Sequence, residues 1–217
     1  MNNFWFIIPA RKGSKRFPYK NRRLVPIVLN QLKNEWLDRT IISTNDEEIL
    51  RIAEKNNIAS HNRSEKNSSD KASMKETLAE IISDCNIDES DFIVCLYPTY
   101  PQRTIEKIEQ ALKFFKSSGA SSMLCKKDIK SHPYLCLEDI GENKGKPFIE
   151  NNLYRWQDFP KCFQYSHFIS ILKVSEINNL NYQLFNKDTV YFNTTDIVDV
   201  DSENDFNDYL SLKEKDT

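Results

Sequence analysis

The sequence predicts an α/β fold in which a doubly wound, mostly parallel sheet is covered by helices. Short apolar runs of strand length alternate with segments of helical periodicity, which is the order of elements in such folds. The first run, Phe4-Trp5-Phe6-Ile7-Ile8, lacks polar alternation, as expected of a strand buried on both faces. With 217 residues, 39% of them hydrophobic, the chain can form one domain around a continuous core.

The first half of the chain gives clear helix-start signals. Asn45 is followed three residues later by Glu48, and Ser73 by Glu76, and both spacings are typical of a capping box. Thr104 precedes apolar residues that share one helical face. After the first strand we therefore expect, in order, a helix at 24–36, a strand at 40–43, helices beginning at 45 and 73, a strand at 92–96, a helix from 104 and a strand at 121–125.

Residues 126–165 break this pattern. Glycines and prolines punctuate a polar segment that is too long for a simple connection, so we expect a small excursion from the sheet within a single domain of residues 1–217. Its aromatic side chains could stack on a ligand, or form a subunit interface, where such side chains are enriched. The chain then returns through expected strands at 168–172, 190–192 and 197–200 and a final helix at 202–212.

The charge balance argues against a nucleic-acid-binding surface. The chain has 30 Lys+Arg and 32 Asp+Glu, for a net charge of −2 and a pI near 6.0. No apolar run approaches the roughly 20 residues that cross a bilayer, and no basic segment precedes the first apolar run. The five cysteines are widely spaced without a C-x-x-C pair and are expected to be reduced. We expect a cytoplasmic protein that binds neither nucleic acid nor membrane.

The loop after the first strand carries the strongest functional signal. Residues 9–21 read P-A-R-K-G-S-K-R-F-P-Y-K-N, and ligands of open α/β sheets bind beyond the carboxyl ends of the strands. Gly13 would let the backbone approach phosphate oxygens, Ser14 adds a donor, and Arg11, Lys15 and Lys20 offer charge-assisted hydrogen bonds. The loop therefore fits a polyphosphate, although a solvated basic loop would have the same composition.

Five segments, in order, resemble the acylneuraminate cytidylyltransferase family, the CMP-sugar synthetases. The loop at 7–21 is similar to I-P-A-R-G-G-S-K followed by P and K-N, with Lys12 in place of the first glycine. The other four segments are I-S-T-N-D-E-E-I at 42–49, R at 63 with D-x-A-S at 70–73, L-Y-P-T-Y-P-Q-R at 96–103 and V-D-V-D-S-E-N-D-F at 198–206. The resemblance covers nearly the whole chain and implies a nucleotide-diphospho-sugar transferase-like fold.

The resemblance also implies a reaction in which a sugar hydroxyl attacks the α-phosphate of CTP and pyrophosphate leaves. It assigns the triphosphate to Arg11, Lys15 and Lys20, of which Arg11 and Lys20 are the candidate catalytic cations. The full set of candidate nucleotide-binding residues is Arg11, Gly13, Ser14, Lys15, Lys20, Asn21, Arg63, Ala72 and Ser73. Ser73 equally fits a helix cap, and Ala72 equally fits simple packing.

Asp199 and Asp201 are the candidate metal ligands. Alternate residues on a strand point to one face, so the two carboxylates could share a hard cation. An acidic strand end could equally be solvated. The resemblance implies Mg²⁺ at this position, bridging to the nucleotide phosphates.

The acceptor half departs from the family pattern. Tyr97 replaces the glutamine that faces the sugar, Trp156 replaces the arginine expected to meet the sugar carboxylate, and the chain between 21 and 38 is several residues shorter. The candidate acceptor residues are Tyr97, Arg155, Gln157 and His167. His167 could be a general base or a packed core residue.

Together these features predict an Mg²⁺-dependent cytidylyltransferase that forms a CMP-sugar from CTP and a sialic-acid-like nonulosonate or related acceptor. The resemblance implies a homodimer formed through 126–165. The alternative is a nucleotide-binding homologue with an altered acceptor or lost catalysis, and a third reading is an enzyme that uses UTP or GTP. Lys20→Ala is expected to cut turnover at little cost in stability.

Overall fold

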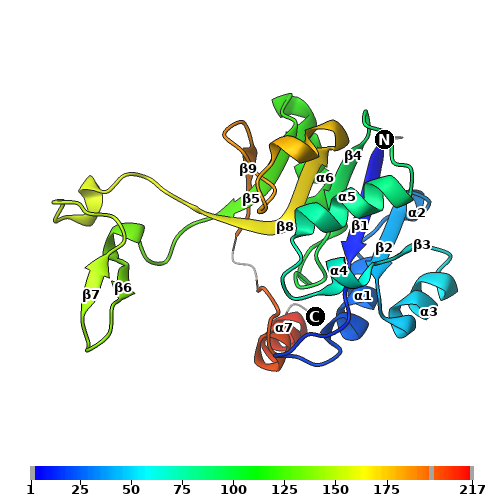
Figure 1. The fold of residues 1–217 in the computed structure, drawn as a ribbon, viewed down its shortest axis with the longest axis horizontal. Helices are drawn as coiled ribbons and strands as arrows, with labels where there is room; N and C mark the ends of the chain where they lie inside the picture. The colour runs from blue at the N-terminus through cyan, green and yellow to red at the C-terminus, as the bar shows by residue number, and fades with distance from the viewer. Residues whose placement is uncertain (1–2, 196–197, 216–217) are drawn as a thin grey trace.

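The computed structural model describes residues 3–195 and 198–215 and shows a central sheet with one projecting arm (Figure 1). In the described residues this is a 7-stranded sheet of order β3-β2-β1-β4-β8-β5-β9, in which only β8 runs antiparallel to its neighbours. The strands are β1 Phe4–Pro9, β2 Thr40–Thr44, β3 Ala59–Asn62, β4 Phe92–Cys95, β5 Ser122–Lys127, β8 Gln164–Lys173 and β9 Val190–Asn193. The expected fold class is confirmed.

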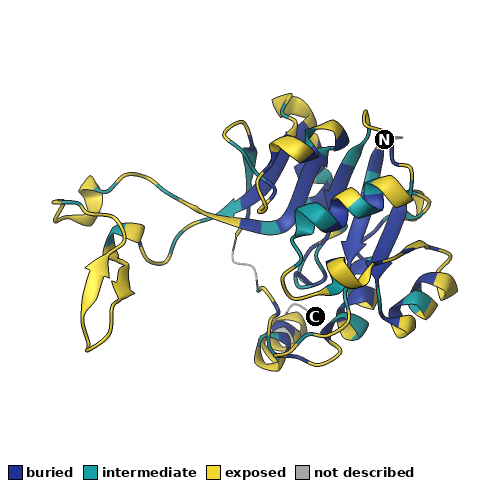
Figure 2. Cartoon of the chain, in the orientation of Figure 1, coloured by how far each residue is buried: buried dark blue, intermediate teal, exposed yellow. Residues whose placement is uncertain are grey.

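Helices cover both faces of this sheet. The described α-helices are α1 Lys20–Leu29, α2 Asn34–Leu37, α3 Glu47–Lys55, α4 Glu65–Ser68, α5 Met74–Asp84, α6 Ile105–Ser118 and α7 Glu203–Lys215, and a 3₁₀ segment, η3, spans Val174–Asn179. Phe6 and Ile8 pack with residues of α1, α3 and α6, whereas Ile7 packs with residues of α5 and η3. Burial on both faces explains why β1 is apolar without alternation (Figure 2).

A third apolar cluster joins the two ends of the chain near the first loop. Phe17 and Leu24 pack with Val200, Phe206 and Tyr209, so α7 lies against α1 and the loop before it. The Phe17 and Phe206 ring centroids are 5.8 Å apart. The C-terminal segment is thereby held beside the carboxyl end of β1.

The arm consists of residues 128–163 and stands away from the sheet (Figure 1). It contains the β-hairpin β6 Leu137–Asp139 and β7 Gly145–Pro147, and the 3₁₀ turns η1 Pro133–Leu135 and η2 Trp156–Asp158. Its one buried side chain among the described residues is His132, whose ring contacts Tyr134, Trp156 and Phe159. Most of the arm is exposed (Figure 2).

Several expected boundaries are wrong. The helix expected at 24–36 is two helices, α1 and α2. After α1 ends, the amides of Gln31 and Leu32 bond to the carbonyls three residues earlier, so the helical hydrogen bonds to the fourth residue back do not continue. The cap of α3 is Asp46 rather than Asn45, since Asp46 accepts the Glu48 amide. β3 was not expected, and residues 198–200 form no strand, while Ile197 lies outside the described residues.

The caps expected at Ser73 and Thr104 are confirmed. Ser73 and Glu76 form a reciprocal capping box at α5, and Thr104 accepts the Lys107 amide at α6. The final helix is confirmed and extends to Lys215, three residues beyond the expected 202–212. None of the helices described here is both long and apolar enough to span a membrane.

Candidate active site

A cleft of about 590 Å³ opens where β1, β3 and β4 end. The sheet order reverses direction between β1 and β4, and such switch points are where open α/β sheets bind ligands. We call it the basic cleft because five of its lining residues are the cations Arg11, Lys15, Arg16, Lys20 and Arg63. The other lining residues are Pro9, Ser14, Asn21, Asp70, Met74, Tyr97, Pro98, Thr99 and Asp201.

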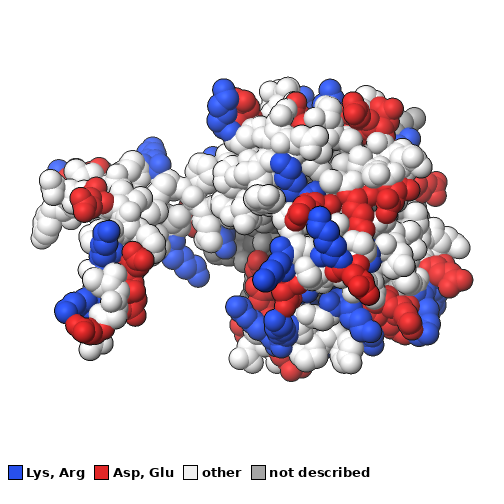
Figure 3. Space-filling view, viewed as in Figure 1, with Lys and Arg blue, Asp and Glu red and all other residues white. Residues whose placement is uncertain are grey.

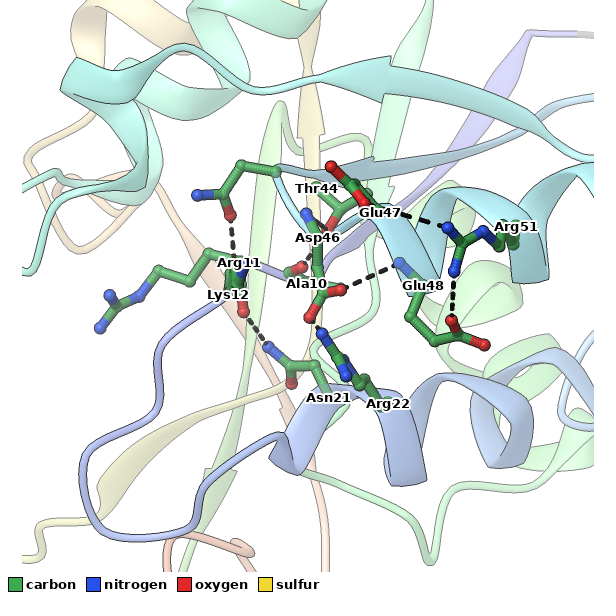
Figure 4. Close-up of polar contacts among 11 residues, drawn as sticks. Ala10, Arg11, Lys12, Asn21, Arg22, Thr44, Asp46, Glu47, Glu48 and Arg51 are labelled. Atoms are coloured by element: carbon green, nitrogen blue, oxygen red, sulfur yellow. Dashed lines mark hydrogen bonds and ion pairs between the residues drawn. The ribbon is translucent and has the colours of Figure 1, made fainter.

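Two neighbouring elements hold the loop that follows β1 (Figure 4). Asn21 at the start of α1 donates from Nδ2 to the Arg11 carbonyl at 2.9 Å, and Asn45 accepts the Lys12 amide at 2.7 Å. Thr44 donates to the Ala10 carbonyl at 2.6 Å. Gly13 has φ +91°, a conformation that side-chain-bearing residues rarely adopt. The loop is thus shaped by its own backbone, by Asn21 of α1 and by residues at the end of β2.

Arg11 and Lys15 converge on one carboxylate. Asp70 lies 2.8 Å from Arg11 Nη2 and 2.5 Å from Lys15 Nζ through its two oxygens. Hydrogen bonds from Lys15 and Arg11 lower the pKa of Asp70 below its ordinary value. The two cations are therefore spaced so that one anion bridges both, which is the arrangement a phosphate group requires.

Lys20 is held more tightly than its neighbours. Its Nζ donates to the Val200 carbonyl and to Asp201 Oδ1, both at 2.9 Å. Its side chain is only 10% exposed. Lys20 therefore also fastens the C-terminal segment, and these contacts lead us to expect a larger stability cost for its removal than the sequence suggested.

Arg63 is a buried cation on the wall of the basic cleft. It is 6% exposed, and among the described residues it forms no ion pair with an Asp or Glu. Burial lowers the pKa of Arg63 to about 10. Its charge is stabilised by Ser43, which accepts at Oγ from Nε (3.2 Å) and at its carbonyl from Nη2 (3.3 Å).

Gly13, Ala72 and Ser73 do not line the basic cleft as described. The Ser73 hydroxyl accepts the Glu76 amide at 3.1 Å and donates to Glu76 Oε2 at 2.8 Å. The helix-cap role of Ser73 is therefore present in the structure. Contact of Ala72 and Ser73 with a nucleotide stays a prediction.

The two candidate metal ligands lie in an extended segment, not on a strand as expected. Asp199 Oδ2 accepts from the Tyr100 hydroxyl at 2.9 Å, and Asp201 lines the basic cleft next to Lys20. The Val200 amide bonds to the Thr99 carbonyl at 2.8 Å, which fixes the segment against the end of β4. In the described chain each carboxylate keeps one oxygen outside these contacts, and carboxylate oxygens suit Mg²⁺.

The candidate acceptor residues fall into two groups. Tyr97 lines the basic cleft and packs against His167 in a tilted ring contact, with ring centroids 5.2 Å apart. Burial raises the pKa of the Tyr97 phenol well above its ordinary value and lowers the pKa of His167. Arg155 and Gln157 lie on the arm, which projects away from the sheet (Figure 1). Arg155 forms a bidentate pair with Asp158.

Two features were missed by sequence reasoning. The sequence shows Asp70 only as part of a motif. Its contact with both Arg11 and Lys15 depends on the packing of the segment between α4 and α5 against the first loop. His61, Glu80 and Asp84 come together behind Arg63, with ligand atoms within 4.8 Å of one another. Both Glu80 oxygens already accept hydrogen bonds, from the Ser64 amide and from Asn67. No sequence motif joins these three positions.

The sheet and its covering helices have the nucleotide-diphospho-sugar transferase fold. A solved structure of CMP:2-keto-3-deoxy-manno-octonic acid synthetase complexed with CTP superposes with a TM-score of 0.71 at 13% identity, covering 99% of this chain and 100% of that chain. The 4-diphosphocytidyl-2C-methyl-D-erythritol synthase of Anaerococcus prevotii gives a TM-score of 0.63 at 14% identity over 96% and 98% of the two chains. These likenesses concern the fold.

The chain belongs to the cytidylyltransferase family, whose sequence model matches residues 5–132. It is 28% identical over 170 residues to a pseudaminic acid cytidylyltransferase of Campylobacter jejuni, covering 72% of each chain. It is also 28% identical over 158 residues to a CMP-N,N′-diacetyllegionaminic acid synthase of Legionella pneumophila, covering 68% of each. An N-acylneuraminate cytidylyltransferase of Streptococcus agalactiae is 25% identical over 72% of this chain and 40% of its own length.

Proposed function

We propose that this protein transfers the cytidylyl group of CTP to a hydroxyl of a nonulosonic sugar acid and releases pyrophosphate. The observation that carries the proposal is the basic cleft, where Arg11, Lys15, Lys20 and Arg63 meet at the switch point of the sheet. Membership of the cytidylyltransferase family supports CTP as the nucleotide. The names of two relatives, a pseudaminic acid cytidylyltransferase and a CMP-N,N′-diacetyllegionaminic acid synthase, support a nonulosonic acid as the acceptor.

In the proposed reaction the acceptor oxygen forms a bond to the α-phosphorus while the bond to the bridging oxygen of the β-phosphate breaks. The electron pair leaves with pyrophosphate, and the hydroxyl proton is lost from the acceptor. Arg11 and Lys20 are assigned to the charge that develops on the transferring and leaving phosphates, with Lys15 on the triphosphate. Gly13 gives the same loop its backbone conformation, Ser14 lines the basic cleft, and Asn21 holds the Arg11 carbonyl.

Asp199 and Asp201 are proposed to hold Mg²⁺. Asp201 lines the basic cleft, whereas Asp199 contacts Tyr100 and is not among the lining residues. Each carboxylate has one oxygen outside the hydrogen bonds of the described residues, and such oxygens suit a hard divalent ion. When bound, the ion would supply charge neutralisation for the phosphates. Lys20 competes for Asp201 in this arrangement, so Lys20 sets how much negative charge Asp201 offers to a cation.

The acceptor is proposed to lie beyond Tyr97, on the side of His167. Burial keeps both rings uncharged at neutral pH, so they offer apolar surface and neutral hydrogen-bonding groups rather than charge. A sugar carboxylate needs a cation or oriented donors, and Arg155 and Gln157 on the arm are the candidates for that role. Within one chain the arm that carries them projects away from the sheet (Figure 1).

A homodimer formed through the arm is part of the proposal. The arm exposes many large apolar side chains, namely Leu135, Leu137, Ile140, Phe148, Ile149, Leu153, Tyr154, Trp156 and Phe163. Patches of this kind in proteins mark interaction surfaces.

We also propose a cytoplasmic location, supported by five free cysteines. Basic and acidic side chains are interspersed on the face of the body shown in Figure 3, as the near-zero net charge would suggest.

The test is release of pyrophosphate from CTP with Mg²⁺ and a panel of pseudaminic acid, N,N′-diacetyllegionaminic acid, N-acetylneuraminic acid and 2-keto-3-deoxy-manno-octonic acid. Turnover with at least one nonulosonic acid, and a CMP-sugar product, is expected. Lys15→Ala serves as a matched variant, because Lys15 is 83% exposed and its loss should weaken CTP binding without unfolding the protein.

Binding of CTP without turnover on any acceptor would contradict the proposed reaction and favour the alternative, a nucleotide-binding homologue that has lost catalysis. The replacement of the sugar-facing glutamine by the partly buried Tyr97 is the observation that favours this alternative. A melting temperature raised by UTP or GTP but not by CTP would contradict the nucleotide assignment.

A further inference from the structure

Arg63 raises a question that the reaction does not answer. It is a guanidinium that is 6% exposed on the wall of the basic cleft, and in the described part of the chain it has no carboxylate partner. A buried charge of this kind is costly unless hydrogen bonds satisfy it. What fixes Arg63 is therefore the geometry of its neutral neighbour, Ser43 on β2, which is fully buried.

Ser43 belongs to a chain of hydrogen bonds that crosses three elements. Arg63 Nε lies 3.2 Å from Ser43 Oγ, Ser43 Oγ lies 3.1 Å from His61 Nδ1, and His61 Nε2 lies 3.2 Å from Asp84 Oδ2. His61 is on β3 and is 4% exposed, and Asp84 is the last residue of α5. This series of hydrogen bonds therefore runs from Arg63 in the basic cleft, through Ser43 on β2 and His61 on β3, to the exposed Asp84.

The donors and acceptors in this chain can be assigned in one direction. Arg63 Nε always donates, so the Ser43 oxygen accepts from it and the single hydroxyl hydrogen is free for His61 Nδ1. Nδ1 must then accept, which leaves the imidazole proton on Nε2, where it faces the Asp84 carboxylate. A proton on Nδ1 would leave the Ser43 hydroxyl hydrogen with no acceptor among the described contacts.

We propose that His61 is a positioning residue for Arg63: held by Asp84 through Nε2, it accepts the Ser43 hydroxyl at Nδ1 and thereby fixes the Arg63 guanidinium in the basic cleft. The inference rests on the proposed function, since Arg63 acts there on the nucleotide. His61 touches neither the cleft nor the reacting atoms as described. It acts through Ser43.

The same side chains could instead gather a metal ion, because the ligand atoms of His61, Glu80 and Asp84 lie within 4.8 Å of one another. The hydrogen bonds favour the positioning role. Both Glu80 oxygens already accept hydrogen bonds, from Ser64 and Asn67. Both His61 nitrogens already have hydrogen-bond partners, Ser43 and Asp84.

Two substitutions of His61 separate its two ends. His61→Asn places an amide oxygen near the position of Nδ1 and keeps an acceptor for Ser43, but loses the contact with Asp84. His61→Gln places an amide nitrogen near Nε2 and keeps the contact with Asp84, but loses the acceptor for Ser43. A merely structural histidine would not distinguish them, whereas a positioning histidine should favour His61→Asn.

We expect KM for CTP to rise about tenfold in His61→Gln and about two- to threefold in His61→Asn and Asp84→Asn. Turnover at saturating CTP should stay within about twofold, because the reacting atoms are not touched. Glu54→Gln, an exposed carboxylate of α3, is the matched control and should behave as the wild type. Equal KM values for wild type and His61→Gln would overturn the proposal.

A second measurement does not depend on activity. The chain has only 3 histidines, so the ¹⁵N resonances of His61 can be assigned by substitution and its tautomer read in the wild-type protein. The Nε2–H tautomer is expected, and an Nδ1–H tautomer or a titration curve shifted by added Zn²⁺ would overturn the assignment. If Arg63→Lys leaves the affinity for CTP unchanged, Arg63 does not act on the nucleotide, and the proposed function rather than the role of His61 is contradicted.

Discussion

Lys15 and Lys20 have the same charge and the same proposed ligand, but the structure holds them differently. The Lys15 side chain is 83% exposed and that of Lys20 is 10% exposed. The sequence shows both as members of one basic motif, because cations next to the end of a strand are recognisable from spacing alone. It does not show which of them is buried, since that depends on Val200, which is 180 residues away along the chain.

Lys20→Ala should lower the free energy of unfolding by about 2 kcal/mol, because a charged hydrogen bond is lost and the Val200 carbonyl is left without its donor. Lys15→Ala should change it by less than about 0.5 kcal/mol, since exposed ion pairs contribute little. Both variants should bind CTP more weakly. Urea unfolding followed by circular dichroism measures the difference, and equal midpoints for the two variants would refute the role of Lys20 in fastening the C-terminal segment.

His167 gives a pH dependence of known sign. Burial lowers its pKa below the ordinary value of 6.5, so between these two values the unfolded chain binds more protons than the folded one. Stability from this group is therefore complete above pH 6.5 and is lost as the pH falls through the folded-state pKa. In His167→Gln the decline in melting temperature below pH 6.5 should be shallower than in the wild type. Parallel curves would show that His167 does not contribute.

At the scale of elements, prediction succeeded where the signal is local. The strand at 92–96, the capping box of α5 and the cap of α6 depend on residues within a few positions of one another. β3 was missed because Ala59–Asn62 is a polar edge strand that forms only by pairing with β2. The antiparallel direction of β8 could not be predicted either, because it follows from the path of the arm, which returns the chain between β4 and β5.

The capping box of α5 allows the two roles of Ser73 to be separated. Ser73→Ala should lower the free energy of unfolding by about 1 kcal/mol through loss of the cap, and Ser73→Asn, which can still cap, should restore most of it. If Ser73 only caps, KM for CTP should be unchanged in Ser73→Asn at equal stability. A raised KM in a variant of normal stability would instead support direct contact with the nucleotide.

At the scale of the whole molecule, the arm is the part that a single chain leaves unexplained. Its position in the sequence was predictable from the failure of periodicity after Lys126, but its extended shape was not, because that shape needs a surface elsewhere to cover its apolar side chains. The candidate site is divided in the same way. The basic cleft is lined by residues of one chain, whereas Arg155 and Gln157 lie on the arm, which projects away from the sheet (Figure 1).

A dimer formed through the arm should therefore be abolished by charge on its apolar surface. Phe148 and Tyr154 are 67% and 95% exposed, so Phe148→Asp with Tyr154→Asp should leave the body folded and convert the protein to a species near the chain mass of 25.5 kDa. Light scattering after size exclusion measures this, and Lys146→Glu on the same arm is the control.

If Arg155 or Gln157 serves the acceptor across the interface, the double variant should also keep its affinity for CTP while losing pyrophosphate release. A wild-type protein that is already monomeric would remove the arm from the account of both assembly and acceptor binding.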